Sequence, residues 1–322
     1  MTRLAGRYEI ERVFADSGGM GLIYLARDTR TKGNPVLIKT VRYDNSEGRK
    51  NFVYTQDEAC KHVGRLRKIL EWEKKILVRL KGERLNNIPN LNDFFYDRSM
   101  TLEPRYSGKL GEYALPEELL AREPYLVLEK ISGKPLEAMM GTPEFEARAE
   151  ELCLKMAKEL CTILLRLHKP FDVQGQKAYF LYQDMKPGNV LVGGDDYFTL
   201  IDMGGVTLRL AGRTTEPTAG VLTAGYAAPE GEGEGATRID ARYDVYTLGA
   251  TLWHCLTGTD PRTLGGQSPV LEPRSLARRT LRPRTTAMIA RALERDPERR
   301  FQSAAEMRRE IVGCLQELGL EE

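Results

Sequence analysis

The segment 182–189, which reads YQDMKPGN, brings together three side chains suited to phosphoryl-group chemistry. An aspartate such as Asp184 can accept or orient the proton of a hydroxyl group. Lys186 can neutralise charge on a moving phosphoryl group, and the amide oxygen of Asn189 can hold Mg²⁺. A second carboxylate, Asp202, follows the apolar pair Leu200–Ile201 and could bridge through Mg²⁺ to phosphate oxygens.

A glycine cluster and a lysine near the N-terminus point to the same chemistry. Gly18, Gly19 and Gly21 lie between two short apolar runs, where backbone N–H groups could approach phosphate oxygens without a Cβ in the way. Lys39 ends an apolar strand and could hold a phosphate if a glutamate fixed its ammonium group. Glu73 is the better candidate for that partner and Glu71 the alternative. A plain turn and a solvated lysine would explain each feature taken alone.

The elements that must position these residues change in type along the chain. Apolar periodicity predicts strands at 8–14, 22–26, 35–41, 91–96 and 125–131, with one helix at 61–80. After residue 133 it predicts helices at 144–167, 245–256, 284–293 and 304–318, and short strands at 190–192 and 198–201. We therefore expect an α+β fold with a small antiparallel β-rich part and a larger helical part. The connections 43–60 and 97–123 are longer than this layout requires, which is typical of functional segments.

Composition excludes several other classes of protein. The 322 residues are 41% hydrophobic and 29% charged, with a net charge of +2, as in a globular protein without the basic bias of a nucleic-acid binder. The five cysteines are widely spaced and include no C-x-x-C pair, which favours reduced thiols. No signal peptide or membrane-spanning run is predicted. We expect a cytoplasmic protein without membrane insertion or nucleic-acid partner.

The ordered set of motifs resembles the Hanks-type protein kinases, and the bacterial serine/threonine branch in particular. The segment 182–189 looks like the catalytic loop, and Asp202–Gly204 looks like D-F-G. Ala228–Pro229–Glu230 matches A-P-E, and the segment beginning at Asp244 resembles the start of the central buried helix of that family. Arg300 in the late D-P-x-x-R segment corresponds to the arginine that pairs with the A-P-E glutamate. The resemblance runs from about residue 7 to about residue 318.

This resemblance implies a bilobal kinase fold, with the N-lobe at 1–131 and the C-lobe at 132–322. It implies that Asp184 is the catalytic base, that Lys186 and Lys39 contact phosphates and that Glu73 orients Lys39. Asn189 and Asp202 would bind Mg²⁺ or Mn²⁺. The implied ATP-binding residues are Gly18, Gly19, Gly21, Ile23, Lys39, Leu128 as gatekeeper, Glu129 and Ile131 in the hinge, and Leu191. Lys186 and Thr223 imply transfer to Ser or Thr hydroxyls of protein substrates, with autophosphorylation.

The chain departs from the pattern of the family at several positions. Asp16 replaces the first glycine of the loop, and Leu37 replaces a small residue above adenine. Tyr182 and Met203 replace the usual His and Phe but remain bulky, so the family's internal stack through Leu77 could still form.

Gln183 replaces the catalytic-loop arginine that binds a phosphorylated activation loop in many relatives. Neutral glutamine cannot replace that charge-assisted contact. We therefore expect activity to depend weakly on phosphorylation of four nearby threonines, Thr214, Thr215, Thr218 and Thr223.

Two alternatives to an active protein kinase stay open from sequence. The first is a pseudokinase that binds nucleotide as a scaffold; Asp16, Leu37 and Gln183 favour it, whereas the retained Lys39 and Asp184 oppose it. The second is a small-molecule kinase of the aminoglycoside phosphotransferase type, which generally lacks the A-P-E motif and the closing arginine. We also expect the segment 97–123 to form a partner or substrate surface.

Overall fold

The computed structural model describes most of the chain. The described residues are 2–15, 21–31, 33–43, 55–82, 85, 87–102, 104–108, 111–210, 223–231, 239–265, 269 and 281–320. The chain divides into two compact units. The first unit comprises Met1–Arg84 and Pro89–Lys130, and the second comprises Leu85–Ile88 and Ile131–Glu322.

The first unit is built on an antiparallel sheet of six strands and one long helix. The order of the strands in the sheet is β1-β2-β3-β4-β8-β5, and β6 pairs separately with β7. The bounds are β1 Arg3–Leu4, β2 Tyr8–Ala15, β3 Gly21–Asp28, β4 Asn34–Val41, α1 Gln56–Lys81, β5 Leu91–Asp97, β6 Arg105–Gly108, β7 Gly111–Ala114, α2 Glu117–Ala121 and β8 Glu123–Glu129.

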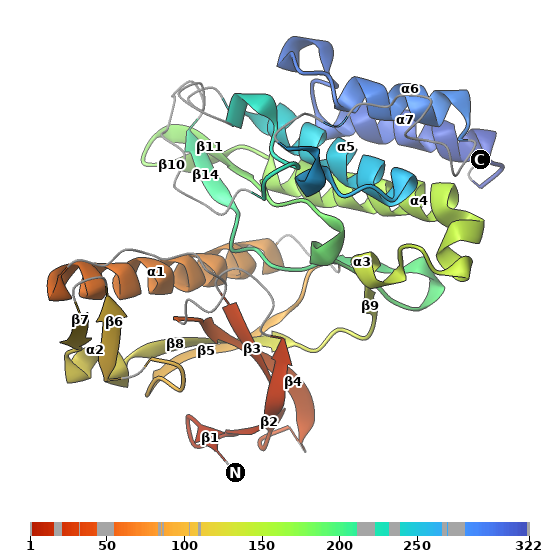
Figure 1. The fold of residues 1–322 in the computed structure, drawn as a ribbon. Coiled ribbons are helices and arrows are strands. Elements are labelled where there is room, and N and C mark those ends of the chain that lie inside the picture. Colours follow the sequence, from red (N-terminus) through yellow and green to blue (C-terminus); the bar gives the residue numbers. More distant parts are fainter. Residues whose placement is uncertain are drawn as a thin grey trace. The chain divides into compact units, whose positions relative to one another are not determined.

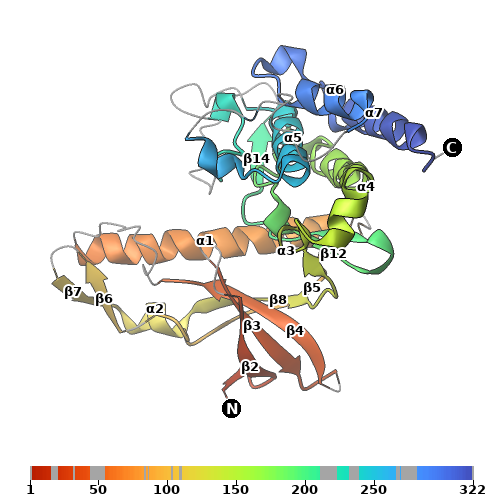
Figure 2. The same cartoon turned by 45° about the vertical axis from the view of Figure 1, so that its right-hand side comes forward.

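A core of aromatic and branched side chains holds this sheet together. Tyr8, Phe95 and Tyr125 stack in a row with ring centroids 5.4 Å apart, and such offset aromatic pairs add to the burial of apolar area. Val36 and Ile38 of β4 are buried in the same cluster. Helix α1 packs against β8, β5 and β4, as Figures 1 and 2 show. The sheet and α1 thus form one body on which Lys39 and Glu73 are carried.

Helix α1 begins earlier than its apolar periodicity predicts. Thr55 caps it, accepting a hydrogen bond from the backbone N–H of Glu58, while the Thr55 hydroxyl donates to Glu58 Oε2 at 3.2 Å. The T-x-x-E spelling at this point is the sequence signature of a capping box, which marks a helix start even before a polar first turn. Residues 56–60 therefore belong to the helix, and the expectation that the whole of 43–60 is a connection was wrong there.

The second unit is mainly helical and contains two small sheets. The sheets have the strand orders β10-β11-β14 and β13-β12-β9. The bounds are β9 Lys134–Pro135, α3 Leu136–Met139, α4 Pro143–Leu167, β10 Phe171–Val173, β11 Gln176–Leu181, β12 Val190–Val192, β13 Phe198–Leu200, β14 Thr207–Leu210, α5 Ala241–Thr257, α6 Pro283–Ala292 and α7 Ala304–Glu317.

Helix α5 lies at the centre of this unit. Every residue from Tyr243 to Thr257 is buried, as the resemblance implied for that helix. Helix α4 packs on α5 and α7, and α6 packs on α5 and α7, an arrangement visible in Figure 2. The caps are local: Asp240 begins α5 and Gly258, at φ 71°, ends it in the left-handed region.

Several elements escaped prediction because they are short. The segment 97–123, expected as one long connection, contains β6, β7 and α2. Strand β8 was predicted at 125–131 but spans Glu123–Glu129, because the chain leaves the sheet before Lys130. The predicted α+β class, with a β-rich first part and a helical second part, is confirmed. Among the described residues, no helix combines the length and apolarity needed to cross a bilayer.

Candidate active site

In the first unit, the predicted lysine and glutamate form an ion pair. Lys39 Nζ lies 2.8 Å from Glu73 Oε2, and the Glu73 side chain is only 2% exposed. Glu71, the alternative partner, instead accepts a hydrogen bond of 2.8 Å from the Tyr96 hydroxyl. Because Glu73 is buried on the face of α1 that contacts the sheet, it is the residue positioned to hold the ammonium group.

The register of the sheet gathers further predicted nucleotide residues around Lys39. Ile23 lies directly opposite Lys39, and Leu37 lies opposite Leu128. Directly opposed residues, and residues two apart on a strand, share one face of a sheet, so these four side chains line one surface. Glu129 projects from the other face and accepts a hydrogen bond from Asn90 Nδ2. Only its backbone could therefore serve a ligand on the Lys39 face.

The glycine loop is described only at its end. Gly18, Gly19 and Asp16 lie outside the described residues. At Gly21 an added Cβ would stand 3.0 Å from Cε of Lys39. A side chain there would press on the lysine, which gives a steric reason for glycine at this position.

In the second unit, the loop 182–189 forms a compact polar cluster around Asp184. Lys186 Nζ lies 2.8 Å from Asp184 Oδ2 and 3.1 Å from Oδ1. Asn189 Nδ2 donates to Asp184 Oδ2 at 2.9 Å and to its backbone carbonyl at 2.8 Å. Thr223 donates its hydroxyl to Asp184 Oδ1 at 2.6 Å. Leu191 follows this loop on β12.

The backbone of this loop is held by a buried carboxylate from α5. Asp244 accepts the N–H groups of Tyr182 and Gln183, each at 2.8 Å, and contacts His168 Nε2 at 2.8 Å. Gln183 has φ of 66°, a left-handed conformation that costs a non-glycine residue about 1–3 kcal/mol. The fixed carboxylate offsets this strain, so the loop keeps the path that presents Asp184.

The aspartate of the D-M-G segment, Asp202, is exposed, and hydrogen bonds fix the backbone around it. Asp202 has φ of 63°, and its Oδ1 accepts the N–H of Gly204 at 3.1 Å. The buried Tyr182 donates its hydroxyl to the carbonyls of Ile201 at 2.8 Å and Asp202 at 3.1 Å. Tyr182 therefore contributes two hydrogen bonds in addition to the apolar bulk expected from sequence. Met203 is buried as well, while Leu77 belongs to the first unit, so their stack stays a prediction.

Asn189 and Asp202 offer the oxygen donors that a hard divalent cation takes. The Asn189 amide directs its nitrogen at Asp184, which leaves the carbonyl oxygen on its other side, and the carboxylate of Asp202 is exposed. Mg²⁺ is usually held by one or two such protein oxygens together with phosphate oxygens. The residues present fit that ion.

Sequence reasoning missed two contributors to this cluster, Thr207 and Gly205, and was partly right about a third. Thr207 donates its hydroxyl to Gln183 Oε1 at 2.6 Å, and both side chains are buried. At Gly205 an added Cβ would stand 3.0 Å from the Cβ of Asp184. Asp244 was expected to cap or to anchor backbone at a helix start; Asp240 is the cap, and Asp244 anchors the backbone of the loop. The double glycine at 204–205 was the only available signal among these, since the Thr207 contact depends on strand pairing.

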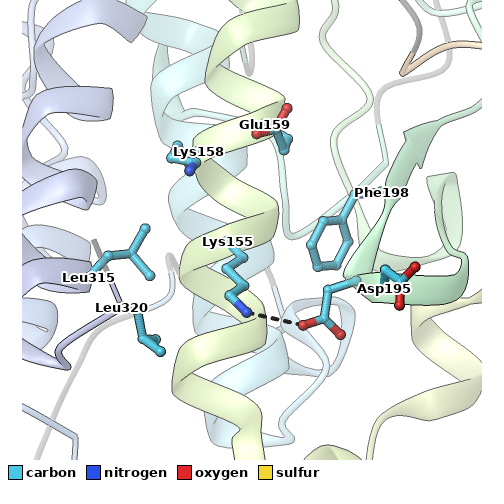
Figure 3. Close-up of a pocket in the computed structure, with 8 residues that line it drawn as sticks. Lys155, Lys158, Glu159, Asp195, Phe198, Leu315 and Leu320 are labelled. Atoms are coloured by element: carbon cyan, nitrogen blue, oxygen red, sulfur yellow. Dashed lines mark hydrogen bonds and ion pairs between the residues drawn. The ribbon is translucent and has the colours of Figure 1, made fainter. Parts of the chain in front are cut away.

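A separate hollow in the second unit contains none of the predicted site residues. It has a volume of about 200 Å³. Figure 3 shows it beside α4, where Lys155 contacts Asp196 at 3.2 Å. Its lining residues are Lys155, Lys158, Glu159, Asp195, Asp196, Phe198, Leu315 and Leu320. Lys155 and Asp196 pair with each other, and the hollow holds none of the predicted site residues, so we do not place the reaction there.

Comparison with known proteins agrees with this geometry. Residues 16–310 match the protein kinase domain family. The chain belongs to this family. It is 28% identical to the probable serine/threonine-protein kinase SCO3848 of Streptomyces coelicolor, over 97% of the chain and 40% of that protein. It is also 28% identical to the serine/threonine-protein kinase PknB of Mycolicibacterium smegmatis, over 96% of the chain and 43% of that protein.

The similarity extends beyond these two groups of bacteria. Serine/threonine-protein kinase A of Synechocystis sp. is 27% identical over 80% of the chain and 42% of that protein. The chain thus spans less than half the length of these relatives. The ion pair of Arg300 with Glu230, at 2.6 and 2.7 Å, completes the set of motifs that distinguishes protein kinases from the aminoglycoside phosphotransferase type.

Proposed function

We propose that this kinase-family chain transfers the γ-phosphate of ATP to Ser or Thr hydroxyls of protein substrates, including its own. The observation that carries the proposal is the cluster at Asp184. One oxygen of this carboxylate already accepts a hydrogen bond from an alcohol, the Thr223 hydroxyl, at 2.6 Å. The other oxygen is held by Lys186 and Asn189. The carboxylate is thus arranged to receive the proton of an acceptor hydroxyl.

The roles of the remaining residues follow from their charges and placement. Lys186 would move partly away from Asp184 to contact the γ-phosphate. Lys39, fixed by Glu73, would bind the α- and β-phosphates. Asn189 and Asp202 would hold Mg²⁺ or Mn²⁺, which when bound would neutralise phosphate charge. The surface of Ile23, Leu37 and Leu128 would contact adenine. The resemblance to the family adds Glu129, Ile131 and Leu191 as further nucleotide contacts.

The decisive experiment is phosphate transfer from labelled Mg-ATP to myelin basic protein. We expect transfer by the wild type, and none by Asp184→Asn or Asp202→Ala at an unchanged melting temperature. Nucleotide binding without transfer would favour the scaffold function. Phosphoamino-acid analysis should find phosphoserine or phosphothreonine; phosphotyrosine would contradict the proposed acceptor class.

We also propose that transfer does not require a phosphorylated activation segment. Gln183 is buried, and its amide oxygen already accepts a hydrogen bond from the Thr207 hydroxyl. The Gln183 side chain therefore has a hydrogen-bond partner without an external anion. Alanine at Thr214, Thr215 and Thr218, which lie outside the described residues, should leave turnover within about twofold of wild type. Thr223 is excluded from this test because it contacts Asp184. Loss of turnover in the triple variant would refute independence from phosphorylation.

A further inference from the structure

A second charged cluster lies buried in the first unit, away from Lys39 and Glu73. Arg67 of α1 donates from Nη2 to Glu123 Oε2 at 2.6 Å and from Nε to the Tyr43 hydroxyl at 2.7 Å. Tyr43 donates to the same Glu123 oxygen at 2.8 Å. Thr40 donates to Glu123 Oε1 at 2.8 Å. We call these four residues the α1 brace.

The α1 brace is almost fully removed from water. The side chains of Arg67 and Glu123 are 8% and 0% exposed. Thr40 and Tyr43 are buried as well. Burial and the nearby Glu123 charge raise the pKa of Tyr43, so its hydroxyl stays a hydrogen-bond donor. A buried ion pair is a poor way to gain stability, because apolar residues of similar size are often as good or better. Unlike apolar packing, the hydrogen-bonded ion pair holds its partners in one defined geometry.

That geometry connects the elements that carry the lysine and the glutamate. Thr40 is the next residue after Lys39 on β4, and Glu123 begins β8, which pairs with β4. Arg67 lies on the buried face of α1, about 9 Å along the axis before Glu73. No glycine or proline lies between Arg67 and Glu73, so a shift of the helix at one residue moves the other.

We propose that the α1 brace positions α1, and through it Glu73, for the ion pair with Lys39. This inference rests on the proposed kinase function for its effect on turnover. The positioning residues are Arg67, Glu123 and Tyr43, and they act through Glu73 rather than on a substrate. The last residue of the segment 97–123 thus serves the fold of the first unit, whatever surface the rest of that segment presents.

The test is a double-mutant cycle between Arg67→Met and Glu73→Gln. We expect Arg67→Met alone to lower kcat/KM about tenfold or more, because small misplacements of catalytic groups carry penalties of that size. In the Glu73→Gln background, the same change should cost less than about twofold, because the ion pair it supports is already lost. Equal losses in both backgrounds would overturn the proposal, since a merely structural defect adds independently.

Arg7→Met is the matched control. In the same unit, Arg7 pairs with Asp28 of β3, at 2.6 and 2.7 Å, and with Asp93 of β5, at 3.0 Å, so the ion-pair partners it has among the described residues lie on strands rather than on α1. It should lower the melting temperature yet leave kcat/KM within about twofold, well below the melting temperature. An equal loss of kcat/KM in Arg7→Met would overturn the proposal, because the effect would then be general destabilisation.

Two further measurements keep the result decisive. If Arg67→Met does not fold, Tyr43→Phe removes one hydroxyl from the brace and should lower kcat/KM about threefold, and no change would count against the brace. The dissociation constant for Mg-ATP is measured through the same cycle. This constant reports on Lys39 without requiring phosphate transfer. An inactive wild type would refute the proposed function. The brace would still be tested, because it predicts that the effects of the two substitutions on the dissociation constant are not additive.

Discussion

At the scale of single residues, the site depends on hydroxyl groups whose importance is invisible without geometry. Tyr182 and Thr223 both lie within the second unit and both donate to the groups that frame the proposed chemistry. One fixes the backbone on either side of Asp202, and the other contacts the carboxylate of Asp184. Removing each hydroxyl while keeping the side-chain volume tests these contacts.

Tyr182→Phe should raise the Mg²⁺ concentration needed for half-maximal activity severalfold. The variant removes about 1 kcal/mol of hydrogen bonding from the carbonyls of Ile201 and Asp202, which hold Asp202 in its left-handed conformation. A titration of activity against Mg²⁺ measures this. Tyr197→Phe, at a tyrosine 43% exposed, is the control, and an equal shift there would argue against the role of Tyr182.

Thr223→Val should slow phosphate transfer about tenfold or more, equivalent to about 1.4 kcal/mol of barrier. Valine keeps the shape of threonine but cannot donate a hydrogen bond to Asp184 Oδ1. It also cannot accept one from the Lys186 ammonium group, which lies 3.0 Å from the Thr223 hydroxyl. Thr223→Ser retains the hydroxyl and should stay within about threefold of wild type. Single-turnover kinetics distinguishes the two; equal rates for valine and serine would show that the hydroxyl is dispensable.

At the scale of elements, a buried ion pair joins the A-P-E segment to the end of the helical core. Arg300 is 0% exposed and meets Glu230 in a bidentate pair, while its Nε donates to the carbonyl of Glu294. The guanidinium also lies over the ring of Tyr246 in α5. Loss of one partner would leave the other charge buried or nearly so.

Arg300→Met should lower the free energy of unfolding by about 3–5 kcal/mol, the usual cost of breaking a buried pair from one side. Chemical denaturation measures this. Its neighbour Arg299 is 69% exposed, so Arg299→Met should cost less than about 0.5 kcal/mol. Arg300→Met with Glu230→Gln should recover part of the loss; similar costs at both arginines would contradict the assigned burial.

At the scale of the whole molecule, the stability of the chain should fall as the pH is lowered. Burial lowers the pKa of His254 and His62 below 6.5, so both are less protonated in the folded than in the unfolded state. The unfolded chain then binds more protons below pH 6.5, and stability declines as the pH falls from there. Hydrogen bonds from Arg148 and Lys155 lower the pKa of Glu151 to about 2, which adds a further loss between about pH 4.5 and 2.

Melting temperatures measured from pH 8 to pH 3 test this order. Stability should be level above pH 7, decline below pH 6.5 and decline more steeply below pH 4.5. Glu151→Gln should flatten the last part of the curve, because it removes the carboxylate whose protonation is unfavourable in the fold. A curve that rises towards acid, or is unchanged by Glu151→Gln, would contradict these pKa shifts.

The sequence by itself determined the class of the fold, the long helices and the residues that gather around Asp184. Apolar periodicity persists over many residues in α1, α4, α5 and α7, and motifs such as 182–189 and 202–204 are local in sequence. Local patterns of this kind survive in any tertiary context, so Asp184, Lys186 and Asn189 could be named in advance. The short strands at 190–192 and 198–200 were predicted, but others such as β6 and β7, and the first turn of α1, were missed because their apolar patterns are brief or absent.

The tertiary structure alone decided which distant side chains meet. The sequence favoured Glu73 and left Glu71 open, and the packing of α1 on the sheet directs Glu73 to Lys39. The contact of Thr207 with Gln183 and the α1 brace of Arg67 with Glu123 join residues far apart along the chain. Such contacts depend on strand register and on the rotation of helices about their axes. Many long-range interactions set these together, so no local sequence pattern predicts the contacts.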